Sequence, residues 1–412
     1  MPDPKSLISA YPVKELTDLV TKFKPKKLNV YIDLKNTLVS LFVPSVANDI
    51  LVTSRTLDSG LDTTITQATL LISSVWKKYA DRLGLDVELF ICTDRGKSCY
   101  HRGIHKDYKA NRLLSDMVGG TTEVLSLDPK TLNKKEYQKY CLAWAKQARD
   151  LNTKISEPIV NTIPGVHYYC LKSLEADFLP YYLISRKFKD EEGILHVVCS
   201  GDKDLYQILN LKNTVMLYKR KQKKYIVSRS SIIPLYSKFH TMSQSAKVKK
   251  SKILSLVKPD DIVAAMALAG DVSDNIPGVE GVGEITSVDM ISNQDVYKKL
   301  VGTIQEAEDR VSEGGKFLKE DEIGISSLSN KWKKALISND VVTASFKMIS
   351  FEILCRWLEN KSTTEKMDYL NYIDKITYKT DIIQSPSAKA LHAVISQLED
   401  YKLEDKTITN LF

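Results

Sequence analysis

The stretch "ILHVVCSGDKD", residues 194–204, indicates the class of fold. It begins as a run of apolar and β-branched residues, which is typical of a buried strand, and it ends with Asp202 and Asp204. The segments "LNVYIDL" (28–34) and "VELFICTD" (87–94) share this pattern, since each is apolar and reaches an acid at or near its end. These segments predict central strands whose carboxyl ends carry acids.

Segments with helical patterning separate these strands. "TQATLLISSVWKKYADRLG" (66–84) has apolar residues at helical spacing, and "LEADFLPYYLISRKF" (174–188) follows a short predicted strand at 165–170. Further along, "TVMLY" and "KYIVS" flank the basic turn "KRKQKK" (219–224) and predict a hairpin. Strands that alternate with helices predict an α/β protein with a parallel sheet.

The composition is that of an ordinary globular protein. The chain has 412 residues, of which 43% are hydrophobic and 27% charged, and this length suffices for two or three domains. A net charge of +8 suits a nucleic-acid binder without requiring one. The six cysteines include no C-x-x-C pair, which argues against a disulfide framework and favours a reducing cytoplasm. The start of the chain lacks the pattern of a signal peptide, and no membrane association is expected.

Eight acids follow predicted strand ends or begin neighbouring helices. In a parallel α/β sheet these positions meet beyond the carboxyl ends of the strands, where ligands bind. One such acid could equally cap a helix, but eight together would repel one another unless a cation compensated them. Oxygen ligands select Mg²⁺ or Mn²⁺, and two such ions can catalyse phosphodiester hydrolysis. The eight acids are Asp33, Asp94, Glu175, Asp177, Asp202, Asp204, Asp271 and Asp274.

Three motifs, in this order, resemble the metal-binding signatures of the 5′-nuclease family: "SLEADF" (173–178), "SGDKDLYQI" (200–208) and "GDVSDNIPGVEGVG" (270–283). That family includes flap endonucleases, the exonuclease domain of bacterial DNA polymerase I and the bacteriophage 5′-exonucleases also called RNase H. The resemblance covers roughly residues 28–290. It implies a PIN-like nuclease domain with a helical arch, a helix–three-turn–helix DNA-binding element and a mostly helical C-terminal region.

The resemblance also assigns the metal ligands. It implies a first cluster and a second site, formed by Asp33, Asp94, Glu175, Asp177 and Asp202 and by Asp204, Asp271 and Asp274, respectively. Asp33, Asp94 and Asp202, together with Lys109, are the expected catalytic residues. The family often has E-A-D-D where this chain has "EADF", so Phe178 replaces one acid. "GVGEITS" also lacks a lysine that is common in relatives after the glycine turn.

The glycine turn predicts where DNA would bind. The segment 259–290 resembles the helix–three-turn–helix that holds duplex phosphates through backbone amides, often with a bound K⁺. Gly278, Gly281 and Gly283 would allow the backbone to approach a ligand closely. A mere turn is the alternative interpretation, although the preceding "GDVSDN" argues against it.

The basic segment "DRGKSCYHRGIHKDYKANR" (94–112) resembles the part of the family that enters the helical arch. The resemblance maps a contact with the scissile phosphate to Lys109 and stacking on a base to Tyr108. A helix would place four basic residues on one face, and a solvated helix surface is the alternative interpretation. These four are Arg102, Lys106, Lys109 and Arg112.

The expected function is that of a metal-dependent 5′→3′ exonuclease or flap endonuclease that acts on 5′ ends of structured DNA and on RNA–DNA hybrids. It would remove RNA primers and flaps during replication. Two alternatives stay open: a PIN-type ribonuclease, and a non-catalytic module that binds branched DNA. The expected parts are a tail (1–27), the nuclease domain (28–245) with an arch at about 95–160, the DNA-binding region (246–300) and the C-terminal region (301–412).

The chain ends in "KTITNLF" (406–412), which resembles short peptides that dock into sliding clamps. Leu411 and Phe412 would make that contact, and their packing on the C-terminal region is the alternative. A single-strand-binding protein is a further expected partner, and the chain is expected to be a monomer.

Overall fold

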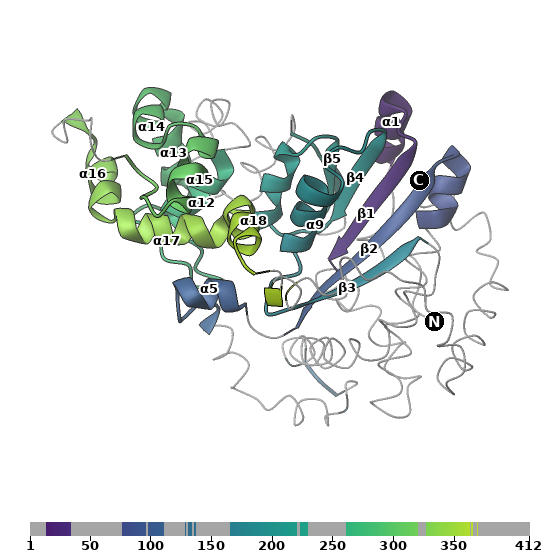
Figure 1. Ribbon diagram of the computed structural model, residues 1–412, viewed down its shortest axis with the longest axis horizontal. Helices are drawn as coiled ribbons and strands as arrows, with labels where there is room; N and C mark the ends of the chain where they lie inside the picture. Colours follow the sequence, from purple (N-terminus) through teal and green to yellow (C-terminus); the bar gives the residue numbers. More distant parts are fainter. Residues whose placement is uncertain are drawn as a thin grey trace.

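The computed structural model describes residues 14–33, 76–95, 98–110, 165–220, 223–229, 261–319 and 327–362, together with residues 128, 131–133, 136, 364–365 and 369 (Figure 1). Most of the expected arch, with Arg112, lies outside the described residues. Leu411 and Phe412 lie outside them as well.

A six-stranded sheet forms the centre of one half of the molecule, with strand order β3-β2-β1-β4-β5-β6. The first five strands are parallel, and β6 pairs antiparallel with β5, so the predicted parallel sheet and the predicted hairpin are both confirmed. The strands are β1 (Lys27–Asp33), β2 (Asp86–Arg95), β3 (Val166–Lys172), β4 (Ile194–Cys199), β5 (Thr214–Arg220) and β6 (Lys223–Val227).

The sheet forms where apolar runs are long enough to be covered on both faces. All six residues of β4 are buried, and five of the seven in β1 are buried. Asp33 is the last residue of β1 and lies opposite Cys92 of β2 in the register. Because the neighbouring strands run in the same direction, Asp33 near the end of β1, Asp94 near the end of β2 and the acids after β4 lie at one edge of the sheet.

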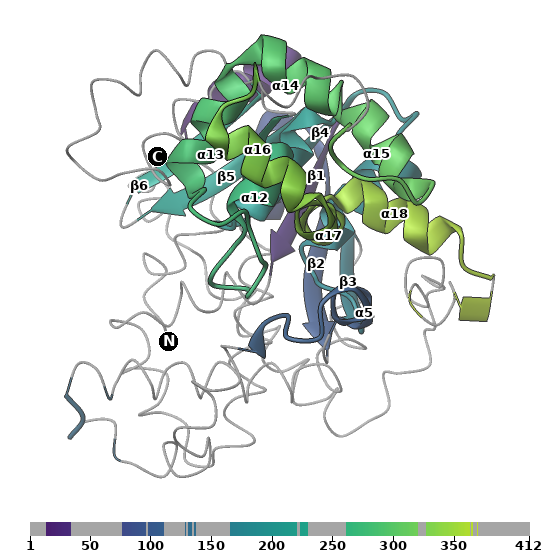
Figure 2. The same cartoon turned by 90° about the vertical axis from the view of Figure 1, so that its left-hand side faces the viewer.

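Helices cover the sheet and extend from it. Figures 1 and 2 show α12 to α18 gathered beside the sheet, with α18 against α9. Residues 76–83 are also helical. The labelled helices, including those just named, are α1 (Lys14–Phe23), α5 (Cys99–Ile104), α9 (Phe178–Tyr182), the π-helix η3 (Leu183–Lys187), the 3₁₀-helix η4 (Asp204–Asn210), α12 (Ile262–Ala269), α13 (Glu284–Ser292), α14 (Gln294–Val301), α15 (Ile304–Ser312), α16 (Asn330–Ile337), α17 (Asn339–Ile349) and α18 (Phe351–Glu359).

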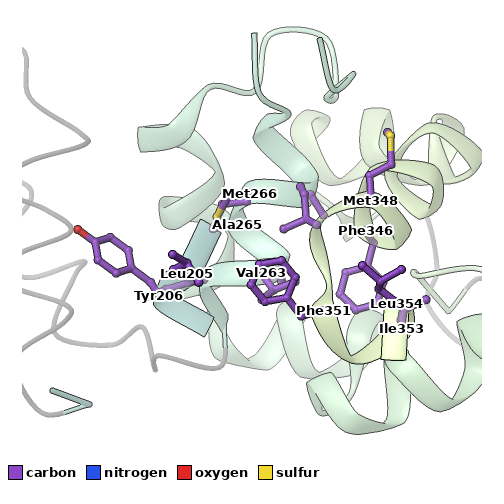
Figure 3. Close-up of a cluster of buried hydrophobic side chains, with 14 of the residues drawn as sticks. Leu205, Tyr206, Val263, Ala265, Met266, Phe346, Met348, Phe351, Ile353 and Leu354 are labelled. Carbon is purple, nitrogen blue, oxygen red and sulfur yellow. The ribbon is translucent and has the colours of Figure 1, made fainter. Parts of the chain in front are cut away.

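A continuous cluster of buried side chains joins the sheet to these helices. Figure 3 shows part of it, with Leu205 of η4, Val263 of α12, Phe346 of α17 and Phe351 of α18 among its members. Helix α12 is apolar on all sides because it runs through this core. Among the described helices, none is long and apolar enough to cross a bilayer.

Candidate metal centre

Two of the expected acids, Asp202 and Asp204, follow the end of β4. After β4, the Asp202 amide donates to Ser200 Oγ at 3.2 Å, and the Asp204 amide donates to Asp202 Oδ1 at 3.2 Å. The Ser200 hydroxyl in turn donates to Asp33 Oδ2 at 3.3 Å. These bonds hold the loop after β4 against the end of β1. Asp33 of β1 and Asp202 after β4 are therefore linked through Ser200.

The segment after β3 adds Glu175 and Asp177. Burial raises the pKa of Asp177 well above its usual value, and the charges of Glu175 and Asp202 raise it further. Burial likewise raises the pKa of Asp204, with further contributions from Asp202 and Asp274. Each of these carboxylates therefore lies within the electrostatic reach of others.

The loop between α12 and α13 carries Asp271 and Asp274. Its two ends meet where Gly270, with φ of +69°, approaches Gly278. A Cβ on Gly278 would lie 2.6 Å from the Gly270 nitrogen and would also clash with the carbonyl of Ala269, so this glycine serves close packing within the protein. Inside the loop, Asp271 accepts two hydrogen bonds from Ser273, at 2.8 Å from its amide and 2.7 Å from its hydroxyl.

Lys109 lies among the carboxylates. Its Nζ is 2.6 Å from both oxygens of Glu175 and 3.4 Å from Asp274 Oδ2. Burial alone would lower the pKa of Lys109, but the charges of Glu175 and Asp274 outweigh it and raise that pKa. Burial opposes ionisation of Glu175 in the same way, and Lys109 overcomes it and lowers the pKa of Glu175.

A second lysine, Lys203, connects the loop that carries Asp271 and Asp274 (residues 270–278, the metal-site loop) to α13, the helix after the glycine turn. Lys203 Nζ lies 3.0 Å from Asp271 Oδ2 and 3.0 Å from Glu284 Oε1, at the first residue of α13. Both acids raise the pKa of Lys203 against the effect of burial. Sequence reasoning did not select this lysine, although it stands between the two acids of "SGDKD".

The structure thus brings most of the expected ligands together. Glu175, Asp177, Asp202, Asp204, Asp271 and Asp274 form one electrostatically linked group. Asp33 joins it through Ser200, and Asp94 lies on β2 two residues beyond Cys92, the register partner of Asp33. Within the described residues, however, no three His, Cys, Asp or Glu side chains stand close enough together to hold a metal ion. The ammonium groups of Lys109 and Lys203 compensate the negative charge of these carboxylates.

The chemistry of the group nevertheless fits a hard divalent cation. Among the residues that the structure describes, Asp204 Oδ1 is buried and has no hydrogen-bond partner, although burying an unpaired carboxylate oxygen is costly. The acids offer only oxygen ligands, which Mg²⁺ and Mn²⁺ prefer. A cation bound here would relieve both the unpaired oxygen and the mutual repulsion.

The basic segment before the arch differs from its prediction. Helix α5 ends at Ile104, and the chain leaves it at His105 with φ of −137° and ψ of 110°. Arg102, Lys106 and Lys109 therefore do not share one helix face, so that expectation is wrong. The reason is tertiary: the Lys109 amide donates to the Asp274 carbonyl at 2.8 Å, which requires a turn in place of a helix.

Tyr108 is buried, with 4% of its surface exposed. Its ring stacks on His101 at 4.5 Å between centroids, and its hydroxyl donates to Asp274 Oδ2 at 3.4 Å. Little of this ring is therefore exposed for stacking on a nucleic-acid base. His101 itself is structural, since its Nε2 lies 2.9 Å from the Met348 carbonyl of α17.

The other residues of the glycine turn are more open than Gly278. Gly281 has φ of +75°, and a Cβ added at Gly281 or Gly283 would meet nothing within 4 Å. The turn therefore presents its backbone to the surroundings just before α13.

Gln207 of the "SGDKDLYQI" motif was also not singled out from the sequence. Its side-chain amide donates to the carbonyls of Asp204 and Ile349 at 2.8 and 2.9 Å.

Comparison with known proteins gives related sequences. The chain is 27% identical over 342 residues to DNA polymerase I of Bacillus subtilis (strain 168), covering 76% of this chain and 31% of that protein. It is 31% identical over 122 residues to a 5′-3′ exonuclease of Mycoplasmopsis pulmonis (strain UAB CTIP), covering 30% of this chain and 33% of that protein. The chain thus spans about a third of the length of these relatives.

Among solved structures, a zinc-bound T5 5′-exonuclease has a TM-score of 0.48 at 12% identity, covering 85% of this chain and 100% of that one. No protein-family model matches the chain.

Proposed function

We propose that the chain is a metal-dependent 5′-nuclease that hydrolyses phosphodiester bonds at 5′ ends or flaps of structured DNA and in RNA–DNA hybrids. The observation that carries this proposal is the convergence of buried carboxylates from separate segments at the carboxyl edge of a parallel sheet, with Lys109 among them. The sequence similarity to DNA polymerase I and to a 5′-3′ exonuclease supports it. Removal of RNA primers and flaps in replication is the corresponding cellular role.

The acids act as ligands in this proposal. Divalent cations, Mg²⁺ or Mn²⁺, supply Lewis-acid activation of water and stabilise the leaving oxygen when they are bound. The Oδ1 of Asp204, which has no hydrogen-bond partner in the described part of the chain, supports a cation position beside it. The residues that would hold the ions are Asp33, Asp94, Glu175, Asp177, Asp202, Asp204, Asp271 and Asp274.

Lys109 has a second role. Once metal compensates Glu175 and Asp274, the ammonium of Lys109 can turn from these carboxylates to the scissile phosphate, where it stabilises developing negative charge. Its side chain is 24% exposed, so it lies at the boundary between the buried acids and the solvent. Arg102 and the exposed Lys106 would add phosphate contacts that weaken with salt.

The duplex would lie on the glycine turn. The open backbone at Gly281 and Gly283 and the amides that begin α13 favour a phosphate, directly or through K⁺. Gly278 contributes indirectly, because it closes the loop that holds Asp271 and Asp274. The turn and the acids would thus position one strand for cleavage.

A substrate panel tests the proposed function. With Mg²⁺, the proposal predicts cleavage of a 5′-flap DNA and of an RNA–DNA hybrid, and products that carry a 5′ phosphate. Cleavage of single-stranded RNA alone would favour the PIN-type ribonuclease. Binding to branched DNA with no cleavage in Mg²⁺ or Mn²⁺ would favour the non-catalytic module.

Partners form a separate proposal. Docking of Leu411 and Phe412 into a sliding clamp predicts weaker clamp binding when both are deleted, and unchanged affinity would contradict it. A single-strand-binding protein is a second proposed partner, and sedimentation should show a monomer.

A further inference from the structure

Two loops that are far apart in the sequence are fastened together beside the acids. The Asn275 Nδ2 donates to the Asp107 carbonyl at 2.8 Å, and the Lys109 amide donates to the Asp274 carbonyl at 2.8 Å. One bond runs from each loop to the other. They join the loop that carries Asp274 to the turn that carries Lys109.

Both loops have an unusual backbone at this junction. Lys109 and Asn275 each have φ of +56°, in the left-handed region. Asparagine tolerates this region, whereas a lysine there carries an energetic cost and persists only when its surroundings hold it. The contacts that hold it include these two hydrogen bonds, the bond from the Tyr108 hydroxyl to Asp274 Oδ2 at 3.4 Å, and the ion pairs of the Lys109 side chain.

The left-handed turn sets the direction of the Lys109 side chain. From this backbone its Nζ reaches both oxygens of Glu175 at 2.6 Å and Asp274 at 3.4 Å. Had helix α5 continued through residue 109, the amide of Lys109 would instead donate to the carbonyl of His105, four residues earlier. Its bond to Asp274 would then be lost, and the side chain would leave from a different backbone direction.

We propose that Asn275 is the positioning residue for Lys109. Its side chain fastens the 107–109 turn to the metal-site loop, and thereby fixes the ammonium that the proposed nuclease function assigns to the scissile phosphate. Asn275 acts through Lys109, because its side-chain amide donates to the backbone carbonyl of Asp107 in the same turn. This inference depends on the proposed function for its catalytic consequence but not for its structural one.

Three substitutions separate the contributions of Asn275. Asn275→Gly keeps the left-handed backbone accessible and removes only the side-chain donor. Asn275→Ala removes the donor and disfavours the backbone. Asn275→Asp keeps the shape and the tolerance for this backbone, but presents a carboxylate oxygen to the Asp107 carbonyl.

Hydrogen exchange with mass spectrometry measures how well the hydrogen bond of the Lys109 amide is protected, and it needs neither metal nor DNA. In Asn275→Gly, exchange of the peptide containing Lys109 should rise at least tenfold, while peptides from α12 keep their wild-type exchange. Asn275→Asp should behave in the same way, and Asn275→Ala should show a larger rise. Unchanged exchange at Lys109 in Asn275→Gly and Asn275→Ala would overturn the inference.

Kinetics test the catalytic consequence. On a 5′-flap DNA, Asn275→Gly should lower kcat at least tenfold and leave KM within twofold of wild type, because the glycine turn remains intact. Faster exchange at Lys109 with an unchanged kcat would overturn the positioning role. An inactive wild-type protein would instead contradict the nuclease proposal alone, and exchange at Lys109 would still decide whether Asn275 fixes the turn.

Discussion

The ammonium nitrogen of Lys109 lies 2.6 Å from each of the two carboxylate oxygens of Glu175. This lysine compensates a buried acid that would otherwise repel its neighbours. The same position makes it a competitor of any cation that binds Glu175. Under the proposed function, Lys109 would link two states of the site, one compensated by lysine and one compensated by metal.

Removing this competitor should strengthen metal binding. We expect Lys109→Met to bind Mn²⁺ about tenfold more tightly than wild type, equivalent to about 1.4 kcal/mol, as measured by isothermal titration calorimetry without DNA. Lys106→Met is the matched control, because Lys106 is an exposed lysine of the same segment and its loss changes the net charge equally. Equal or weaker Mn²⁺ binding by Lys109→Met would contradict the competition.

The packing at Gly278 predicts a sharp difference between two glycines. Gly278→Ala places a Cβ against the backbone of Ala269 and Gly270, and should lower the free energy of unfolding by about 1–3 kcal/mol. Gly103→Ala is the control, since its Cβ would meet nothing within 4 Å and alanine favours the helix by up to about 1 kcal/mol. Urea unfolding measures the free energy of unfolding of both variants. Equal stabilities would show that Gly278 does not pack closely against Ala269 and Gly270.

Phe178, the last residue of the "EADF" stretch, belongs to the core. Its side chain is fully buried and lies 5.7 Å from the Tyr182 ring and 6.3 Å from the Phe351 ring. Phe178→Ala should cost about 3–5 kcal/mol of unfolding free energy, and Phe178→Asp should cost at least as much. Phe178→Leu should retain most of the stability. A stable Phe178→Asp variant that binds an additional Mn²⁺ ion would contradict this placement.

Glu308 should make stability depend on pH. Burial raises its pKa from 4.5 to about 7, although the Ser350 hydroxyl donates to it at 2.8 Å and lowers the pKa somewhat. The folded state favours the protonated carboxyl, so this group costs nothing below pH 4.5. The free energy of unfolding falls as the pH rises from 4.5 to 7, by up to about 3 kcal/mol.

Glu308→Gln removes this titration. Relative to wild type, it should gain stability between pH 4.5 and pH 8 in thermal unfolding followed by circular dichroism. Glu313→Gln, at an exposed residue that ends the same helix, should follow the wild-type profile. Parallel profiles for Glu308→Gln and wild type would show that Glu308 is not the group responsible.

The sheet was predictable because its strands are covered on both faces. The continuous apolar runs of β1 and β4 follow from that burial, and the acids after them meet because parallel strands end at one edge. The turn at Lys109 was not predictable in the same way, because spacing alone favours a helix there. Its conformation depends on Asp274 and Asn275, which come from a distant part of the chain.

The core position of Phe178 depends on tertiary contacts as well. Its motif resembles a metal signature, and the sequence does not reveal that Phe351 of α18 would pack beside it. The lysine bridge from Lys203 to Glu284 is equally hidden, because it joins a loop of the sheet to a helix after the glycine turn. The sequence predicted Lys109 as a catalytic residue but not its ion pair with Glu175, and it did not single out Lys203.

The most direct test of the proposed nuclease is cleavage of a 5′-labelled flap DNA by wild-type protein and Asp202→Asn, each with Mg²⁺ or EDTA. The account predicts Mg²⁺-dependent release of 5′ products by wild type, none with EDTA, and a loss of at least a hundredfold in Asp202→Asn with its fold retained. Cleavage that persists at the wild-type rate in Asp202→Asn, or in EDTA, would contradict the assignment of these acids as the metal centre.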